Sequence, residues 1–174
     1  MVRAPSANGP DAKGIENRTQ LLHDLGVLVT LWSQLELHIE VEIARITGMS
    51  FHHASIVLGT LQHKAKTSIL YSLLRTQERT DVIPKIKAAI NFAKRNALMH
   101  SAMATEADFS KFVFFSRTMD DAYKVKALRY TAEEFHQHVY KFRDLANVAI
   151  HHLSIPEEEL GAYGKAALFD LQGP

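Results

Sequence analysis

The chain has 174 residues, and its 20 Lys and Arg side chains almost balance 19 Asp and Glu, which gives a formal charge of +1 with neutral histidine. Apolar residues make up 47% and charged residues 22% of the sequence, which is typical of a globular protein and excludes a disordered chain. The absence of cysteine excludes disulfides, thiolate metal sites and cysteine nucleophiles. The near-neutral charge argues against a protein that coats nucleic acid by bulk charge, so any nucleic-acid chemistry must belong to a local site.

Nothing in the sequence predicts contact with a membrane. The longest apolar stretch, Val27–Trp32, is far shorter than the ~18 residues that a membrane span needs. The chain also does not start with the apolar segment of a secretory signal. We therefore expect one soluble domain in the cytoplasm, since domains hold roughly 100 to 200 residues.

The first half of the chain predicts helices. Residues 1–14 are small and polar and are interrupted by proline and glycine, so we expect a disordered leader. Between residues 15 and 48 apolar side chains return every three or four positions, which predicts a long amphipathic helix that a glycine ends. Ser50 opens a short helix that ends at Gly59, and a second short helix is expected over residues 62–76.

The second half predicts one more helix and then a change of structure. Pro84 marks the start of a helix that is expected to reach Met103, because proline in a first turn loses no helical hydrogen bond. Two β-favouring runs follow, 112–115 and 123–127, and residues 118–121 between them are turn-like. The simplest interpretation is a β-hairpin inserted between helices.

A capping box opens the last long helix. Thr131 and Glu134 have the Thr-x-x-Glu spacing in which each side chain satisfies a backbone N–H of a new helix. Periodic apolar residues carry this helix to Leu153, and Pro156 stops it. Residues 154–174 are expected as a tail whose apolar side chains need a surface to cover.

Together these elements predict an all-α helical bundle with a small β-hairpin before the last long helix. The expected organisation is a leader at 1–14, a single helical domain at 15–153 and a C-terminal tail at 154–174.

Ten histidines invite a metal hypothesis, but their spacing argues against it. Two adjacent pairs, 52–53 and 151–152, would point about 100° apart on a helix, which is poor for one ion. Glu133 and His136 form a single Glu-x-x-His, whereas helical di-iron sites need two copies. We therefore expect no metal and no other cofactor.

The helix that begins near Pro84 carries a stripe at alternating steps of three and four. The stripe consists of Ile86, Ala89, Ala93, Asn96, His100 and Met103. Small residues at 89 and 93 let a second helix come close, so we expect Ala89, Ala93 and Met103 to form the seam of a homodimer. Unpaired polar groups in such a seam cost about 1 to 3 kcal/mol each, so Asn96 and His100 must have partners or a use.

Arg95 lies beside this stripe. On a regular helix its direction differs from that of His100 by roughly 140°, so the two residues do not share a face. They meet only if the long Arg95 side chain swings round, or if a second copy of the helix supplies one of them.

At these residues the sequence resembles the HEPN superfamily (higher eukaryotes and prokaryotes nucleotide-binding), all-helical domains marked by Arg, four to six residues and then His. The match is Arg95-Asn96-Ala97-Leu98-Met99-His100, within a resemblance that covers about residues 17–153. The same spacing occurs by chance at Arg18 and His23, which lie at the start of the first helix, where the family does not place its motif. The resemblance implies metal-independent RNA cleavage by a homodimer.

The resemblance also implies a role for each residue. His100 would carry a proton at the ribose 2′-hydroxyl or the leaving oxygen, because imidazoles exchange protons near neutral pH. Arg95 would neutralise phosphate charge, and Asn96 would orient His100 or donate to the same oxygens. Glu36, on the first helix, is a possible orienting partner of Arg95.

Two features of the sequence leave alternatives open. Lys94, Lys124 and Lys126 form a basic rim that suits RNA, although exposed lysines also serve solubility. Asn96 and His100 also suit a polar pair that only fixes helix register. A toxin or defence ribonuclease, with a cognate antitoxin or nucleotidyltransferase partner, is the first hypothesis, and a noncatalytic nucleotide- or protein-binding or regulatory module is the alternative.

Overall fold

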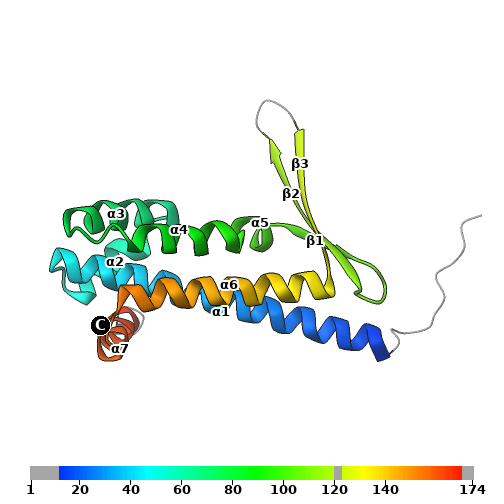
Figure 1. Ribbon diagram of the computed structural model, residues 1–174, viewed down its shortest axis with the longest axis horizontal. Coiled ribbons are helices and arrows are strands. Elements are labelled where there is room, and N and C mark those ends of the chain that lie inside the picture. The colour runs from blue at the N-terminus through cyan, green and yellow to red at the C-terminus, as the bar shows by residue number, and fades with distance from the viewer. Residues whose placement is uncertain (1–11, 120–122, 170–174) are drawn as a thin grey trace, which may run out of the picture. The chain divides into compact units, whose positions relative to one another are not determined.

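The computed structural model of the protein describes residues 12–119 and 123–169 (Figure 1). These residues are mostly helical, with one small antiparallel sheet. The elements are α1 (Ala12–Thr47), α2 (Phe51–Gly59), α3 (His63–Thr76), α4 (Val82–Ala93), α5 (Arg95–Met99), β1 (Ala102–Thr105), β2 (Lys111–Met119), β3 (Tyr123–Thr131), α6 (Ala132–Leu153) and α7 (Glu157–Phe169).

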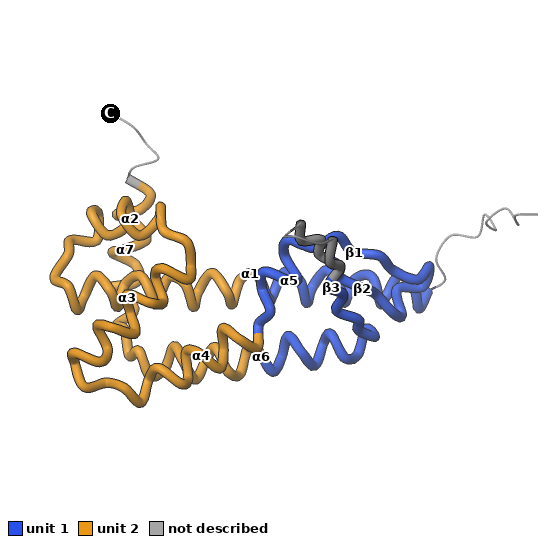
Figure 2. The backbone as a smooth tube through the Cα atoms, turned by 90° about the horizontal axis from the view of Figure 1, so that it is seen from above, with its two compact units in different colours: residues 1–28, 93–141 blue, residues 29–92, 142–174 orange. Residues whose placement is uncertain are grey.

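The chain groups into two compact units, where we expected one helical domain (Figure 2). Unit 1 contains residues 1–28 and 93–141, and unit 2 contains residues 29–92 and 142–174. The long helices α1 and α6 each begin in unit 1 and end in unit 2, because the division falls inside them.

Unit 2 is helical, and its core is aliphatic and aromatic. Leu35, Ile39, Leu70, Leu74 and Phe142 are fully buried. The short helices follow the predicted bounds closely, and Ser50 caps α2 as expected, since its hydroxyl accepts the backbone N–H of the third residue of that helix. Gly48 ends α1 with a φ of +67°, the left-handed conformation that glycine adopts at no steric cost.

Residues 157–169 of the segment expected as a C-terminal tail form a helix, α7. This helix packs against α2, and Tyr163 is buried with its ring 5.8 Å from that of Phe51. Pro156 just before the helix and the three glutamates of its first turn favour a helix start. Two glycines in the segment lower its helix propensity, which explains why the pattern predicts it poorly.

Unit 1 combines the sheet with the first parts of α1 and α6. The strands have the order β1-β2-β3 and pair antiparallel, with Ala104 opposite Val113 and Phe112 opposite Tyr130. Phe112 lies 5.3 Å from the ring of Phe135 on α6, so the inner face of the sheet rests on that helix. The predicted hairpin is confirmed as β2 and β3, and part of its turn, residues 120–122, lies outside the described residues.

The predicted capping box is confirmed. The backbone N–H of Thr131 donates to Oε2 of Glu134 at 2.7 Å, and the backbone N–H of Glu134 donates to Oγ1 of Thr131 at 3.1 Å. The helix that follows ends at Leu153, as its apolar pattern predicts.

Two predicted boundaries are wrong. Helix α1 begins at Ala12, three residues before its expected start, and the rest of the expected leader lies outside the described residues. The helix expected from Pro84 to Met103 ends at Ala93, and Lys94 then adopts a left-handed conformation with a φ of 47°. A single turn, α5, follows, and Met103 lies in β1, an edge strand that the pattern does not predict. No helix of the described residues is long and apolar enough to cross a membrane.

Candidate active site

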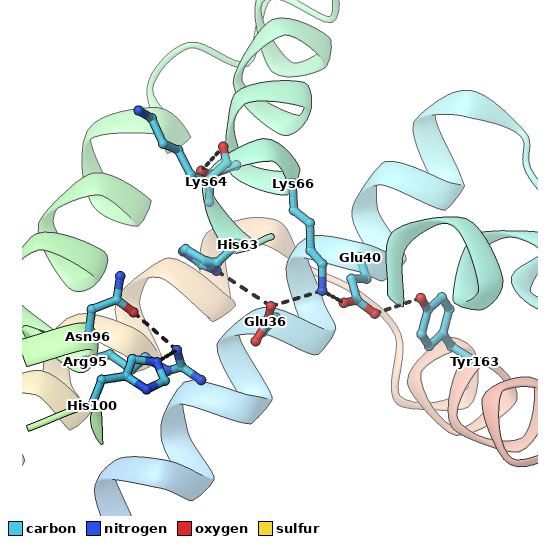
Figure 3. A network of polar contacts seen from close by, with 10 residues as sticks. Glu36, Glu40, His63, Lys64, Lys66, Arg95, Asn96, His100 and Tyr163 are labelled. Atoms are coloured by element: carbon cyan, nitrogen blue, oxygen red, sulfur yellow. Dashed lines mark hydrogen bonds and ion pairs between the residues drawn. The ribbon is translucent and has the colours of Figure 1, made fainter. Parts of the chain in front are cut away.

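The structure brings Arg95, Asn96 and His100 together in unit 1 (Figure 3). Nη1 of Arg95 donates to Oδ1 of Asn96 at 3.2 Å and to Nε2 of His100 at 3.1 Å. The side chains of Asn96 and His100 are exposed, and Arg95 is half-buried. The three polar groups therefore form one cluster that a solvent-borne ligand can reach.

The helix break explains how two residues with divergent directions meet. A regular helix would hold Arg95 and His100 about 140° apart. Here the helix lasts only from Arg95 to Met99, and His100 leaves it with a φ of −107° and a ψ of 14°. Its backbone N–H closes the turn on the carbonyl oxygen of Asn96 at 3.2 Å. One protomer thus holds both groups, without a second copy of the helix.

The contact between Arg95 and His100 has only one possible direction. A guanidinium only donates hydrogen bonds, so Nε2 of His100 is the acceptor in this contact. An acceptor nitrogen therefore lies directly beside a fixed positive charge. The pair therefore combines a proton acceptor with a phosphate-binding group.

The expected dimer stripe is buried at one end and exposed at the other. Ala89 and Ala93 are completely buried within the chain, whereas Asn96, His100 and Met103 are exposed. A seam between two copies stays a prediction. Met103 is 41% exposed on β1, and Met99, the residue before His100, is 40% exposed.

The basic rim is partly described. Lys94 is exposed at the break between α4 and α5, and Lys126 is exposed on β3. Lys124 lies two residues earlier on the same strand. Their role in substrate binding stays a prediction.

Glu36 belongs to a polar network in unit 2 that the sequence did not predict (Figure 3). Its Oε1 accepts a hydrogen bond from Nζ of Lys66 at 3.0 Å and lies 3.8 Å from Nδ1 of His63. Lys66 also donates to Glu40, whose other oxygen accepts the hydroxyl of Tyr163 at 2.8 Å. An ion pair between Glu36 and Arg95 stays a prediction.

The network shifts the pKa values of Glu36, Lys66 and Tyr163. Although burial disfavours the charged carboxylate, the neighbouring His63 and Lys66 lower the pKa of Glu36 to about 2. Burial disfavours the charged ammonium of Lys66, but its bonds to Glu40 and Glu36 outweigh burial and raise the pKa of Lys66 above its usual value. Burial and the bond to Glu40 also raise the pKa of the Tyr163 hydroxyl. The Glu36 carboxylate and the Lys66 ammonium are therefore charged at neutral pH.

The low pKa of Glu36 predicts a loss of stability in acid. Its pKa is about 2 in the folded chain against 4.5 for a free glutamate, so the carboxylate stabilises the fold above pH 4.5. This contribution, of the order of 3 kcal/mol, is lost as the pH falls from 4.5 towards 2. Urea unfolding at several pH values measures it: Glu36→Gln should lose less stability in acid than the wild type. The exposed Glu16→Gln serves as the control, and a Glu36→Gln variant with the wild-type acid response would contradict the assignment.

A second unpredicted pair joins α1 and α6 in unit 1. Asp24 is 1% exposed, and its carboxylate accepts Nδ1–H of His136 at 3.1 Å and the amide N–H of Gln20 at 3.0 Å. Because Asp24 and His136 are 112 residues apart, no local sequence pattern predicts this contact. Across residues 12–119 and 123–169 no group of three or more His, Asp or Glu side chains is arranged to hold a metal ion.

No protein-family model, no curated protein and no solved structure matches this chain. A functional assignment must therefore come from the chemistry of its own residues.

Proposed function

We propose that this chain is a HEPN-like, metal-independent endoribonuclease of the toxin or defence type, with Arg95, Asn96 and His100 as its active site. The observation that carries the proposal is the hydrogen bond from Nη1 of Arg95 to Nε2 of His100 at 3.1 Å, in an exposed turn. It joins a phosphate-binding cation to a potential general base in one place.

The backbone at the site gives independent support. Lys94, directly before the cluster, has a φ of 47°, which costs a residue other than glycine about 1 to 3 kcal/mol. Residues held in such conformations cluster at functional sites, where the strain fixes a geometry that a regular helix does not give. Here the strained residue permits the turn in which Arg95 reaches His100.

The proposed reaction begins when a phosphate of RNA binds Arg95. A charge-assisted bond to phosphate is stronger than a bond to neutral imidazole, so the phosphate draws the guanidinium away and frees the lone pair on Nε2. His100 then takes the proton of the ribose 2′-hydroxyl, and the 2′-oxygen attacks the adjacent phosphorus. The bond to the 5′-oxygen breaks, and that oxygen leaves with a proton from the imidazolium or from water.

Arg95 and Asn96 act on charge and geometry in this scheme. The guanidinium neutralises charge that develops on the non-bridging phosphate oxygens. The amide oxygen of Asn96 accepts from the same Nη1 of Arg95 that binds His100, and its NH₂ group offers further donors to the phosphate oxygens. The basic side chains of Lys94, Lys124 and Lys126 would guide the RNA backbone to the cluster.

The proposal includes a homodimer and further partners. Since Ala89 and Ala93 are buried, the exposed Met99 and Met103 near His100 are the better candidates for contact with a second copy. A cognate antitoxin or nucleotidyltransferase would control the activity in the cell, and the cytoplasm is the expected compartment.

The decisive experiment incubates the purified chain with mixed RNA in EDTA. The proposal expects cleavage without metal, with 2′,3′-cyclic phosphate and 5′-hydroxyl ends, because the 2′-oxygen is the nucleophile. An RNA that is 2′-O-methylated throughout serves as the control and should stay intact. A requirement for metal or a 3′-hydroxyl product would refute the mechanism, and RNA that is bound but not cut would favour the noncatalytic binding module.

A further inference from the structure

An open pocket of about 590 Å³ lies in unit 1, where β1, β2 and β3 meet the start of α6. We name it the sheet-end pocket, and the residues that matter for its chemistry are Ala104, Glu106, Lys111, Val113, Arg129 and Glu134. Ligand pockets commonly have volumes of about 300 to 1,000 Å³, so its size suits a small organic group.

The cationic side of the pocket is available to a ligand. Arg129 is exposed on β3 and makes no hydrogen bond or ion pair with any described residue. Lys111 is 3.7 Å from Glu106, but both side chains are more than half exposed, so water screens this ion pair strongly. Two cations at one edge of a pocket favour a phosphate.

The floor of the pocket is apolar. Ala104 and Val113 lie directly opposite each other on β1 and β2, and both belong to the face of the sheet that turns away from Phe135. Neighbouring apolar side chains of this kind can pack against the face of a planar ring, as the unpaired bases of single-stranded RNA require.

Two carboxylates, Glu106 and Glu134, also line the pocket, beside the hydroxyls of Thr105, Tyr130 and Thr131. The carboxylate of Glu134 uses Oε2 for its capping bond, and its other oxygen has no partner among the described residues. Glu106 accepts a hydrogen bond from the hydroxyl of Ser110 at 3.1 Å, and its further lone pairs can accept hydrogen bonds from a ligand. An ionised carboxylate only accepts hydrogen bonds, so these two groups select for N–H donors on a ligand.

The pocket is close to the candidate active site along the chain. Strand β1 begins two residues after His100, and α5 packs against β2. Ala104 is four residues from His100, which limits the distance between their Cα atoms to about 14 Å. A short stretch of RNA can therefore reach both places.

We propose that the sheet-end pocket binds one unpaired nucleobase of single-stranded RNA, with Arg129 and Lys111 on an adjacent phosphate and Glu106 and Glu134 on the exocyclic amine. This inference rests on the proposed ribonuclease function and names its substrate: single-stranded RNA in which adenine, cytosine or guanine is preferred to uracil. Uracil has no exocyclic amine, so it leaves the carboxylates with fewer donors.

The test measures binding, without cleavage, by fluorescence anisotropy of the His100→Ala chain. The probes are a short labelled oligouridine and the same oligonucleotide with one central adenosine. The adenosine probe should bind about five- to tenfold more tightly. Glu134→Gln is informative because glutamine keeps the oxygen that accepts the capping bond but adds an N–H donor. Together with Glu106→Gln it should abolish the preference for the adenosine probe over oligouridine.

Arg129→Ala tests the phosphate contact. It should weaken the binding of both probes by about tenfold and flatten the slope of log K against log salt by about 0.7, the value for one phosphate contact with a single strand. Arg75→Ala, an exposed arginine of unit 2, removes the same charge elsewhere and should change neither. Circular dichroism melting confirms that each variant is folded.

The outcomes separate this inference from the ribonuclease assignment. Unchanged binding and preference in the Arg129 and glutamine variants would overturn the pocket, even if the wild type cleaves RNA. A wild type that cleaves no RNA, but whose pocket variants lose affinity and preference as expected, would overturn the ribonuclease and keep the pocket.

Discussion

Replacement of His100 by alanine should lower the rate of RNA cleavage by about 10²- to 10⁴-fold, the usual contribution of a positioned general acid or base. The large effect follows from the geometry, since His100 presents the lone pair that Arg95 now holds at 3.1 Å. Single-turnover cleavage of a labelled RNA measures the rate directly. Binding of the RNA should change much less than the rate, because the imidazole acts in the transition state.

The chain supplies a matched control for this prediction. His23 is an exposed histidine with the same spacing from an arginine, Arg18, and His23→Ala should cleave at the wild-type rate. Arg95→Ala should also be severely impaired, and Arg95→Lys should recover part of the rate because it keeps the charge but loses the planar fork of donors. Equal rates for His100→Ala and His23→Ala would remove the active site from residues 95–100.

The Lys66→Met variant should lose about 3 kcal/mol of unfolding free energy. Lys66 is only 5% exposed and binds Glu36 and Glu40, so its removal leaves two carboxylates facing each other without a cation. Breaking a buried ion pair from one side costs about 3 to 5 kcal/mol, and the partial exposure of the two glutamates puts this case at the lower end. Urea unfolding followed by circular dichroism gives the value.

Two variants decide whether charge is the cause. Lys64→Met makes the same chemical change on the exposed side of the same helix and should cost less than about 0.5 kcal/mol. Addition of Glu36→Gln and Glu40→Gln to Lys66→Met removes the uncompensated charges and should restore much of the loss. A triple variant as unstable as Lys66→Met would mean that the lysine stem stabilises by packing.

The sequence predicted well those features that depend on neighbouring residues. The Thr131–Glu134 capping box needs only a spacing of three and is present as expected. The hairpin of β2 and β3 follows from two β-favouring runs and the turn signal between them. Both features are local, so their energetics are contained in short stretches of sequence.

The sequence did not predict the features that depend on contacts between distant residues. Neither glycine nor proline marks the break at Lys94, so the periodic pattern extends the helix across it. Strand β1 exists because it pairs with β2, a choice that local propensity does not reveal. Lys66 and Glu36 are 30 residues apart, and only packing brings such side chains together.

The candidate site was therefore predicted in composition but not in arrangement. Arg95, Asn96 and His100 were identified from a motif, whereas helical geometry placed the arginine and the histidine on different faces. They meet because His100 lies just beyond the last residue of a single helical turn. The sheet-end pocket had no sequence signal, since its residues come from three strands and a helix.

The single turn α5 has one more consequence for how the site assembles. Because Arg95 and His100 are separated by only four residues of one chain, their encounter costs no translational entropy and does not depend on protein concentration. A deletion or insertion of one residue within this turn would rotate the imidazole away from the guanidinium, while most surface substitutions would leave them aligned. Natural selection acting on such a site would conserve the length of this segment more strictly than the identity of its spacer residues.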